Sequence, residues 1–347
     1  MTPRFTNRFR VRPLAPAVGI VLLALIGLSG CATLSDAGYY FNLWRASRAG
    51  DRFYRNYEPG ERDVAFTEVS DVRLDVYSPE EGDGHPVLIF VHGGGWDKYD
   101  KQLFAPVAMK LVPRDLVVVI PDYTLYPDAT YRQMSREVAA AVAWTFDHID
   151  AYGGDPDRIV LSGHSAGGHL SGLVALDGSW LAEFDHSPDE LCGWVGLSGV
   201  YDVDAQMAFE RAGGGEAPVM TAVMEGEENF PAASPITYVG RGAAQDGAGT
   251  AAGGAGTAGG GAAASEDGSG RAAAHPPVIR LIHGALDETV PVSMSTDFAE
   301  RLEAAGLPVE LTIYPESDHA DFLFEGLTDD NAQVLLDLTE TVRGCAE

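Results

Sequence analysis

Short apolar runs of strand length alternate with helix-like segments along most of this chain, and no other feature constrains the fold as strongly. The runs at 86–91 and 116–120 are continuously apolar, which is typical of strands buried on both faces. Further strand-like runs lie at 64–69, 72–77, 158–162, 194–198, 278–282 and 309–314, and helices are expected at 131–149, from 165 and at about 330–343. Strands that alternate with helices predict an α/β fold with a mostly parallel sheet covered on both faces.

Residues 241–274 interrupt this pattern, because 24 of the 34 positions are Gly or Ala and none is Val, Leu, Ile or aromatic. Such a segment buries too little apolar surface to offset the entropic cost of ordering it. It is therefore predicted to be a disordered insertion in a single domain that spans 61–347. A domain boundary here is disfavoured, because the strand-like run after the tract is needed to complete the sheet.

The first 31 residues have the organisation of a secretory signal. Four arginines without an acidic residue precede an apolar run at 14–28, which is shorter than the about 20 residues that a transmembrane helix needs. The following Leu28-Ser29-Gly30-Cys31 resembles a bacterial lipobox, in which the cysteine is lipidated and becomes the first residue of the mature protein. This resemblance implies a signal peptide over 1–30 and a lipid anchor on Cys31. An ordinary signal peptide and an uncleaved anchor are the alternatives.

A lipid anchor would place the protein in the bacterial cell envelope, attached to a membrane and facing outside the cytoplasm. Ala32 follows the cysteine, and a residue other than aspartate at this place favours the outer membrane. Residues 31–60 would then form a tether, in which the apolar residues between 37 and 57 have roughly helical spacing. A helix there would pack either on the domain or on the membrane surface.

Charge and cysteine content exclude several classes of protein. The chain has 51 acidic and 23 basic residues, a formal net charge of −28, and no basic stripe, so nucleic acid is not expected as a partner. Three cysteines are too few for a disulfide-rich scaffold or a four-cysteine zinc site. If Cys31 carries lipid, Cys192 and Cys345 remain, and they could pair in an oxidising envelope. Alternatively, Cys192 simply packs in the core.

The candidate nucleophile is Ser165, in the sequence Gly163-His164-Ser165-Ala166-Gly167. A bare Gly-x-Ser-x-Gly is weak evidence, because a chain with 41 glycines has an appreciable chance of containing one. This one directly follows an apolar strand and opens a helix-compatible stretch. That context is the one in which two glycines allow a sharp turn that lifts the serine hydroxyl out of the backbone.

A second glycine cluster, His92-Gly93-Gly94-Gly95-Trp96, follows the strand-like run at 86–91. Glycines at such a place let backbone N–H groups point at a ligand without an intervening side chain. The tetrahedral intermediate of acyl transfer needs such donors for its oxyanion. A turn that merely requires positive φ angles is the alternative.

Together with Pro121-Asp122-Tyr123 and the run at 153–159, these motifs resemble the α/β-hydrolase esterases. The resemblance is greatest to the carboxylesterase branch that includes hormone-sensitive-lipase-like and prenylcysteine-methylesterase-like enzymes, and it extends from about residue 60 to the C-terminus. It implies an α/β-hydrolase fold with a small cap, here the segment 200–238. The apolar side chains of this cap segment would line a pocket or form its own core. The resemblance also implies that Gly94, Gly95 and Ala166 donate backbone N–H groups to the oxyanion.

The remaining triad members are expected after late strands, because this fold carries them in the order Ser, acid, His. Asp287 follows the strand-like run at 278–282, and His319 follows the run at 309–314. Weaker candidates are Asp297 inside the next expected helix, Glu288 beside Asp287, and the histidines His92, His164 and His283. His92 and His283 are expected to brace their loops. His164 and His169 are spaced off one helical face, which disfavours a zinc pair.

The predicted activity is hydrolysis of a small-molecule carboxylic ester through an acyl-enzyme, with no metal or organic cofactor. Trp96, beside the oxyanion loop, is a candidate wall of the substrate site. A carbohydrate-ester deacetylase and an arylformamidase-like amidase share the triad and remain alternatives. A non-catalytic envelope binding protein on a hydrolase scaffold is the alternative from another class. The sequence leaves the oligomeric state open.

Overall fold

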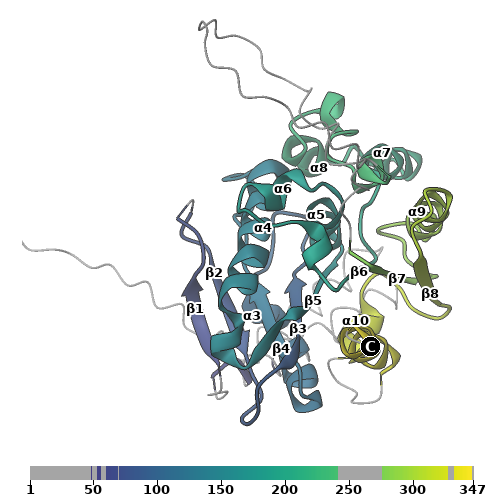
Figure 1. Cartoon of the computed structure of the whole chain (residues 1–347). Coiled ribbons are helices and arrows are strands. Elements are labelled where there is room, and N and C mark those ends of the chain that lie inside the picture. Colours follow the sequence, from purple (N-terminus) through teal and green to yellow (C-terminus); the bar gives the residue numbers. More distant parts are fainter. Residues whose placement is uncertain are drawn as a thin grey trace, which may run out of the picture.

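The computed structural model describes residues 48, 53–55, 60–68, 70–240, 276–326 and 332–345. The predicted signal peptide, Cys31, most of the predicted tether and the tract 241–274 lie outside these residues. The described part is built around one eight-stranded sheet (Figure 1). Its strands are β1 (Glu61–Ala65), β2 (Arg73–Tyr77), β3 (His85–Val91), β4 (Val117–Pro121), β5 (Gly154–His164), β6 (Gly193–Leu197), β7 (Val278–Gly284) and β8 (Val309–Tyr314).

The sheet is parallel over most of its width, as the sequence predicted. The strand order is β1-β2-β4-β3-β5-β6-β7-β8. All neighbours from β4 to β8 run parallel, whereas β1 with β2 and β2 with β4 are antiparallel. Because parallel strands end at the same edge of a sheet, the loops that follow β3, β5, β7 and β8 converge at one edge.

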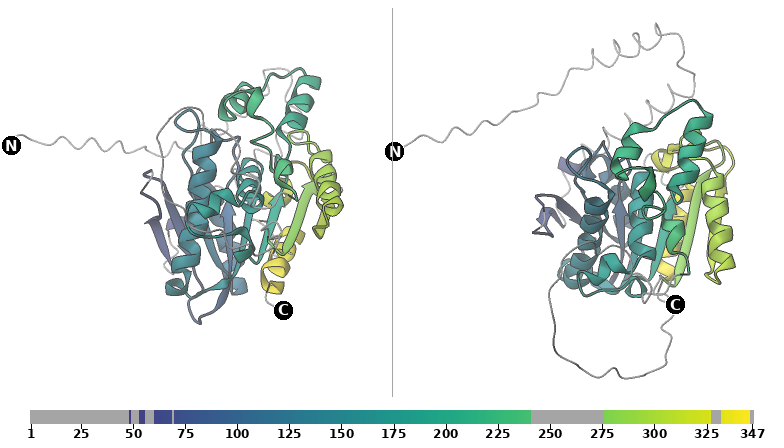
Figure 2. Two further views of the ribbon diagram at one scale, coloured as in Figure 1. Left: turned by 45° about the horizontal axis from the view of Figure 1, so that its top comes forward. Right: turned by 90° about the horizontal axis from the view of Figure 1, so that it is seen from above.

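Alternate residues of the central strands face two separate cores. In β3, Val87, Ile89 and Val91 lie in one core, and Leu88 and Phe90 lie in the other. Both faces therefore need a layer of helices, and Figures 1 and 2 show helices on both sides. The first core is covered by α4 (Tyr131–His148), α5 (Ala166–Leu176), α6 (Ser179–Ala182), α7 (Val203–Ala212), α8 (Pro218–Val223) and α9 (Ser293–Ala304). The second core is covered by α3 (Lys101–Leu111), α10 (Asp321–Gly326) and α11 (Gln333–Gly344).

The first strand departs most from its predicted boundaries. The sequence predicted a strand at 64–69, but β1 begins at Glu61 and ends at Ala65. This edge strand pairs only with β2, and the register shifts between Glu61 and Val64, where Asp63 has a left-handed φ of 57°. The antiparallel partner and the bulge, neither of which is visible in local sequence, determine where β1 pairs.

The cap segment follows β6 and contains α7 and α8, which lie together at one end of the molecule (Figure 1). Its side chains Met207, Met220, Met224 and Phe230 are buried in the first core, whereas Phe209 is exposed. These four side chains therefore form the core of the cap and attach it to the sheet. Within the described residues, we find no helix with the length and hydrophobicity to cross a bilayer.

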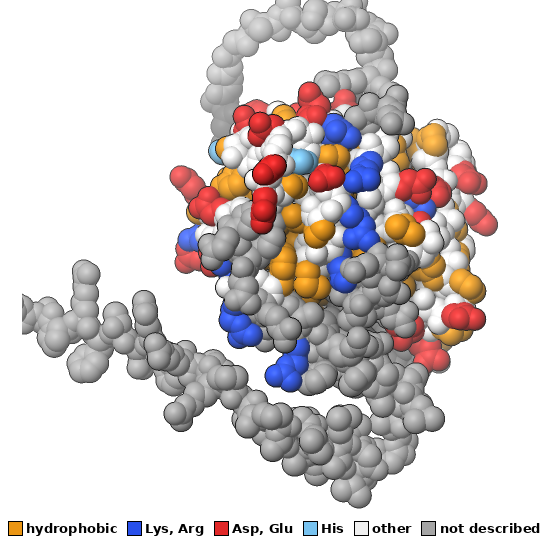
Figure 3. All heavy atoms as spheres, turned by 90° about the horizontal axis from the view of Figure 1, so that it is seen from below, with side chains coloured by type: hydrophobic (Ala, Val, Ile, Leu, Met, Phe, Trp, Pro, Cys, Tyr) orange, Lys and Arg blue, Asp and Glu red, His pale blue; other side chains and the backbone are white. Residues whose placement is uncertain are grey.

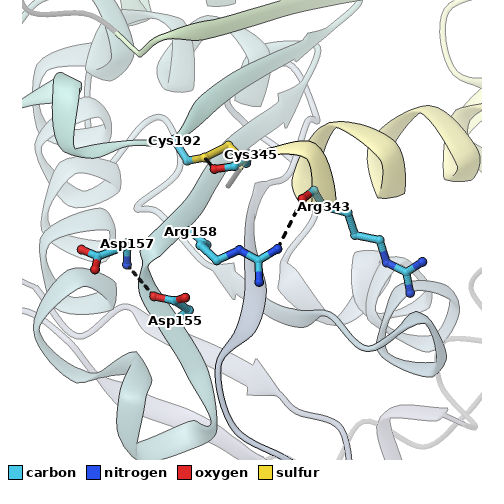
Figure 4. Close-up of a disulfide and its surroundings, with 6 residues drawn as sticks. All are labelled: Asp155, Asp157, Arg158, Cys192, Arg343 and Cys345. Atoms are coloured by element: carbon cyan, nitrogen blue, oxygen red, sulfur yellow. Dashed lines mark hydrogen bonds between the residues drawn. A yellow bond between two sulfur atoms is a disulfide. The ribbon is translucent and has the colours of Figure 1, made fainter. Parts of the chain in front are cut away.

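A disulfide joins Cys192 to Cys345, with the two Cα atoms 5.6 Å apart (Figure 4). Cys192 directly precedes β6, and Cys345 directly follows α11. The covalent link therefore fixes the end of α11 beside the start of β6. Beside it, the Arg158 guanidinium donates to the backbone carbonyl of Arg343 over 3.3 Å (Figure 4). The sequence left open whether Cys192 pairs with Cys345 or only packs in the core. In the structure the two cysteines are paired.

Replacing both cysteines by serine is expected to lower the free energy of unfolding by about 2–4 kcal/mol, because the disulfide restricts the unfolded chain. The linked residues are 153 positions apart, so the closed loop is long. Chemical denaturation of the oxidised wild type and the Cys192→Ser/Cys345→Ser variant measures the difference. Catalytic rates should agree, because neither cysteine lies at the carboxyl edge of the sheet. Equal unfolding midpoints would contradict this expectation.

Charges of both signs mix on the face shown in Figure 3. Lys and Arg side chains lie there between Asp and Glu side chains, with hydrophobic side chains interspersed. Among the described residues, exposed ion pairs include Arg343 with Asp115 and Arg136 with Glu183. Pairs of this kind contribute at most about 1 kcal/mol each. The acidic excess therefore bears on solubility and steering of ligands more than on the fold.

Candidate active site

Ser165 lies at a sharp turn between the end of β5 and the start of α5. Its backbone has φ 56° and ψ −121°, a conformation that is strained for a residue with a side chain. A Cβ on Gly163 would lie 2.2 Å from the carbonyl oxygen of Gly167, and a Cβ on Gly167 would lie 2.2 Å from that of Val91. Both glycines of the motif are therefore required by close backbone approach, as the predicted nucleophile turn demands.

Gly167→Ala is expected to lower stability by about 1–3 kcal/mol and to reduce turnover, because the new methyl group would push α5 away from β3. Gly178→Ala is a matched control. Gly178 has an ordinary φ of −61°, and the nearest atom to its added Cβ is Pro188 Cδ at 3.7 Å. Thermal melts and ester hydrolysis of the two variants measure both effects. Equal behaviour of the two variants would show that the turn tolerates the displacement.

The structure brings together the three residues that the sequence proposed as a triad. His319, from the loop after β8, has Nε2 at 2.9 Å from Ser165 Oγ. Its Nδ1 lies 2.7 Å from Asp287 Oδ2, in the loop after β7. Ser165 is thus connected through an imidazole to a carboxylate. In this arrangement a hydroxyl can lose its proton to a base while the base remains oriented and charge-balanced.

The Asp287 carboxylate is buried but well supplied with donors. Its Oδ1 accepts the backbone N–H groups of Thr289 and Val290, both over 2.8 Å. Its Oδ2 also lies 3.1 Å from His283 Nε2. Burial acts to raise the pKa of Asp287, but the hydrogen bonds from His283, His319 and the backbone outweigh burial and hold this pKa well below its usual range. Asp287 is therefore ionised at neutral and at mildly acidic pH.

The glycine loop after β3 runs directly against the nucleophile. A Cβ on Gly93 would lie 2.8 Å from the His164 carbonyl oxygen and 3.1 Å from Ser165 Cβ. Gly94 and Gly95 have φ values of 130° and 59°, which favour glycine. The Gly94 carbonyl accepts the N–H groups of Asp97 and Lys98, which turns the loop back on itself.

The predicted oxyanion donors therefore come from two adjoining elements. Gly94 and Gly95 belong to the loop that touches Ser165. Ala166 is the first residue of α5, where an N–H has no carbonyl acceptor inside the helix. This placement fits the predicted role, and the role itself stays a prediction.

Comparison with known proteins gives matches over most of the chain. The sequence model of the BD-FAE family matches residues 74–245. Isoprenylcysteine alpha-carbonyl methylesterase ICME of Arabidopsis thaliana is 28% identical over 269 residues, which is 76% of this chain and 57% of that protein. Probable carboxylic ester hydrolase LipM of Mycobacterium tuberculosis is 27% identical over 288 residues, 78% of this chain and 58% of that protein. The chain thus spans somewhat more than half the length of these relatives.

Solved structures decide the fold. The butyrate-bound structure of a thermophilic esterase, Est2 of Thermogutta terrifontis, has a TM-score of 0.57 at 21% identity and covers 83% of this chain and 92% of that one. A putative thioesterase from Silicibacter sp. gives 0.61 at 19% identity, with 89% and 94% covered. The chain has the α/β-hydrolase fold. Ser165, Asp287 and His319 occupy the loops in which this fold carries a triad.

Four histidines brace the candidate site. His92 Nδ1 lies 2.9 Å from the Gly93 carbonyl, and His283 Nδ1 lies 2.7 Å from Ser295 Oγ, so both hold loops as predicted. The contacts of the other two histidines, His164 and His169, were not predicted from the sequence. His164 Nε2 bonds the backbone carbonyl of His319 over 2.9 Å, and burial lowers the pKa of His164 to about 3. His164 is thus a neutral support for the loop of the proposed base.

His169 is the fourth of these histidines, and it contacts Trp96. Trp96, the candidate wall, is largely buried, and its indole N–H donates to His169 Nδ1 over 3.2 Å. A role of Trp96 as a substrate wall stays a prediction. Among the described residues, no three His, Cys, Asp or Glu side chains are arranged to hold a metal ion. The only sequence signal for these contacts was the placement of His164 and His169 on either side of Ser165.

Proposed function

We propose that this protein is a serine carboxylesterase that cleaves small-molecule esters through an acyl-enzyme. One observation carries the proposal: Ser165 Oγ, the His319 imidazole and the Asp287 carboxylate form a continuous chain with contacts of 2.9 and 2.7 Å. The names of the matched relatives support it, since they include a methylesterase and a carboxylic ester hydrolase. The Est2 structures in complex with butyrate and propionate point to esters of short acids as the first substrates to test.

The geometry supports the following steps. Ser165 Oγ attacks the ester carbonyl carbon while His319 Nε2 takes the hydroxyl proton, and Asp287 stabilises the imidazolium through Nδ1–H. Backbone N–H groups of Gly94, Gly95 and Ala166 stabilise the oxyanion. The C–O bond to the alcohol then breaks, and the imidazolium returns its proton to the leaving oxygen. Water repeats the attack on the acyl-enzyme, with His319 again as base, and releases the acid.

Hydrolysis of p-nitrophenyl esters from acetate to laurate, by protein that lacks residues 1–31, tests this proposal. We expect hydrolysis with an optimum at one chain length, together with labelling of Ser165 by a fluorophosphonate. Labelling without hydrolysis of any ester would move the assignment to the carbohydrate-ester deacetylase or the amidase. Absence of both labelling and hydrolysis would overturn the enzymatic assignment in favour of a binding protein.

We further propose that the protein is a lipoprotein of the cell envelope, anchored through Cys31 and favouring the outer membrane. The Cys192–Cys345 disulfide supports an oxidising compartment, because disulfides are rare in the cytosol. Fractionation of cells that express the wild type or Cys31→Ala, with metabolic labelling by a palmitate analogue, tests the anchor. We expect label and membrane association in the wild type only. Equal distribution of the two proteins would exclude the lipid anchor.

A further inference from the structure

His169 contacts both the oxyanion loop and the cap while lying one helical turn after the nucleophile. Its backbone N–H donates to the Ser165 carbonyl over 3.0 Å, so its position is fixed relative to Ser165. Its Nδ1 accepts the Trp96 indole N–H over 3.2 Å, with the two rings edge to face. Its Nε2 lies 2.7 Å from the Ala233 carbonyl of the cap segment. One fully buried side chain thus links three parts of the site.

The two ring contacts require a neutral imidazole in one tautomer. Nδ1 accepts a hydrogen bond from Trp96, and Nε2 must carry the proton in order to donate to the Ala233 carbonyl. Burial lowers the pKa of His169 to about 4, so the ring is neutral at neutral pH. A charged ring would have two donors and would lose the bond from Trp96.

The two hydrogen-bond partners of His169, Trp96 and Ala233, each lie in a segment whose position bears on the proposed site. Trp96 directly follows Gly95 and has a left-handed φ of 64°, which is rare for a bulky residue and needs support from its surroundings. Its carbonyl accepts the Tyr126 N–H over 2.9 Å, which holds its backbone, and the indole contact with His169 holds its side chain. Ala233 precedes Ser234, whose hydroxyl accepts the Val203 N–H at the start of α7. His169 therefore supports both the oxyanion loop and the cap.

We propose that His169 is a positioning residue with two separable functions: through Trp96 it orients the oxyanion loop, and through Ala233 it sets the position of the cap over the substrate. The proposal rests on the esterase function proposed above. The Trp96 contact should affect the transition state, because oxyanion donors act only there. The Ala233 contact should affect which acyl groups fit.

Two near-isosteric substitutions separate the functions. His169→Asn places an amide oxygen near the position of Nδ1, so it keeps an acceptor for Trp96 and loses the donor to Ala233. His169→Gln places an amide NH₂ near the position of Nε2, so it keeps the donor to Ala233 and loses the acceptor for Trp96. Trp96→Phe keeps the aromatic ring and removes the indole N–H. The readouts are kcat and KM across the ester series, the rate of Ser165 phosphonylation by a fluorophosphonate, and the melting temperature.

We expect His169→Gln and Trp96→Phe each to lower kcat and the phosphonylation rate by about 10-fold with KM unchanged, a fraction of the ~10²–10³ that loss of a whole oxyanion donor costs. The double variant should be no slower than either single variant, because both remove the same hydrogen bond. His169→Asn should keep kcat for acetate and raise KM about 10-fold for the longer esters.

Multiplicative effects of Trp96→Phe and His169→Gln would overturn the proposal, as would identical changes in His169→Asn and His169→Gln. If the His169 variants do not fold, Trp96→Phe alone decides, since an unchanged phosphonylation rate overturns the oxyanion arm. Phosphonylation needs no ester substrate. A wild type that is labelled yet hydrolyses no ester would therefore contradict the esterase assignment while still testing the positioning role.

Discussion

Replacement of Ser165 by alanine is expected to lower kcat for ester hydrolysis by about 10⁶-fold, the size of effect that removal of a triad nucleophile produces. Without Oγ no acyl-enzyme forms, and the His319 imidazole has no hydroxyl to deprotonate. The fold should be retained, because the strained turn is set by glycine packing and by the Ser165 backbone N–H, which donates to the Leu197 carbonyl over 2.9 Å. Steady-state hydrolysis of p-nitrophenyl acetate measures the change.

Ser162→Ala is the matched control for this experiment. Ser162 lies three residues earlier, inside β5, is fully buried, and has a hydroxyl without a hydrogen-bond partner among the described residues. Its removal should leave kcat within about threefold of the wild type, because it touches no part of the proposed mechanism. A Ser165→Ala protein that retained more than a tenth of the wild-type rate, with Ser162→Ala unchanged, would remove Ser165 as the nucleophile.

The sequence predicted the fold and the location of the site because both depend on local patterns at strand ends. Continuous apolar runs marked the buried strands, and the loops after 86–91, 158–162, 278–282 and 309–314 carried the chemistry. The resemblance to the α/β-hydrolases assigned Asp287 and His319 to loops after late strands. In a mostly parallel sheet such loops converge on the same edge as Ser165. The contacts at 2.9 and 2.7 Å agree with that inference.

What the sequence missed depends on contacts between distant segments. Trp96 and His169 are 73 positions apart, and only the packing of α5 against the loop after β3 brings them together. The pairing of Cys192 with Cys345 was left open for the same reason, since it requires the end of α11 to lie under β6. The boundaries of β1 depend on an antiparallel partner and a bulge. None of these features leaves a local pattern.

The depressed pKa of Asp287 has a consequence for stability at low pH. Its folded-state pKa lies below the unfolded value, so the unfolded chain binds more protons as the pH falls. The stabilisation is fully present above the unfolded pKa, near pH 4, and is lost as the pH falls toward the folded value. We therefore expect Asp287 to stay ionised at mildly acidic pH, so that its protonation causes no loss of activity there.

Asp287→Asn is expected to lower kcat by about 10⁴-fold while the protein remains folded, because the amide would change the tautomer of the base. An amide NH₂ facing His319 Nδ1 requires that nitrogen to accept, which moves the proton to Nε2 and leaves Ser165 without an acceptor for its hydroxyl proton.

Glu288→Gln removes the same charge one residue later, from an exposed side chain, and should change kcat less than threefold. Measurements of kcat and melting temperature for both variants separate orientation of the base from loss of negative charge. Equal losses of kcat in the two variants would mean that the loop acts through its negative charge and not by orienting the imidazole. A near-normal kcat for Asp287→Asn would show that the His319 imidazole stays oriented without the carboxylate, through His283, 3.1 Å from Asp287, or another neighbour.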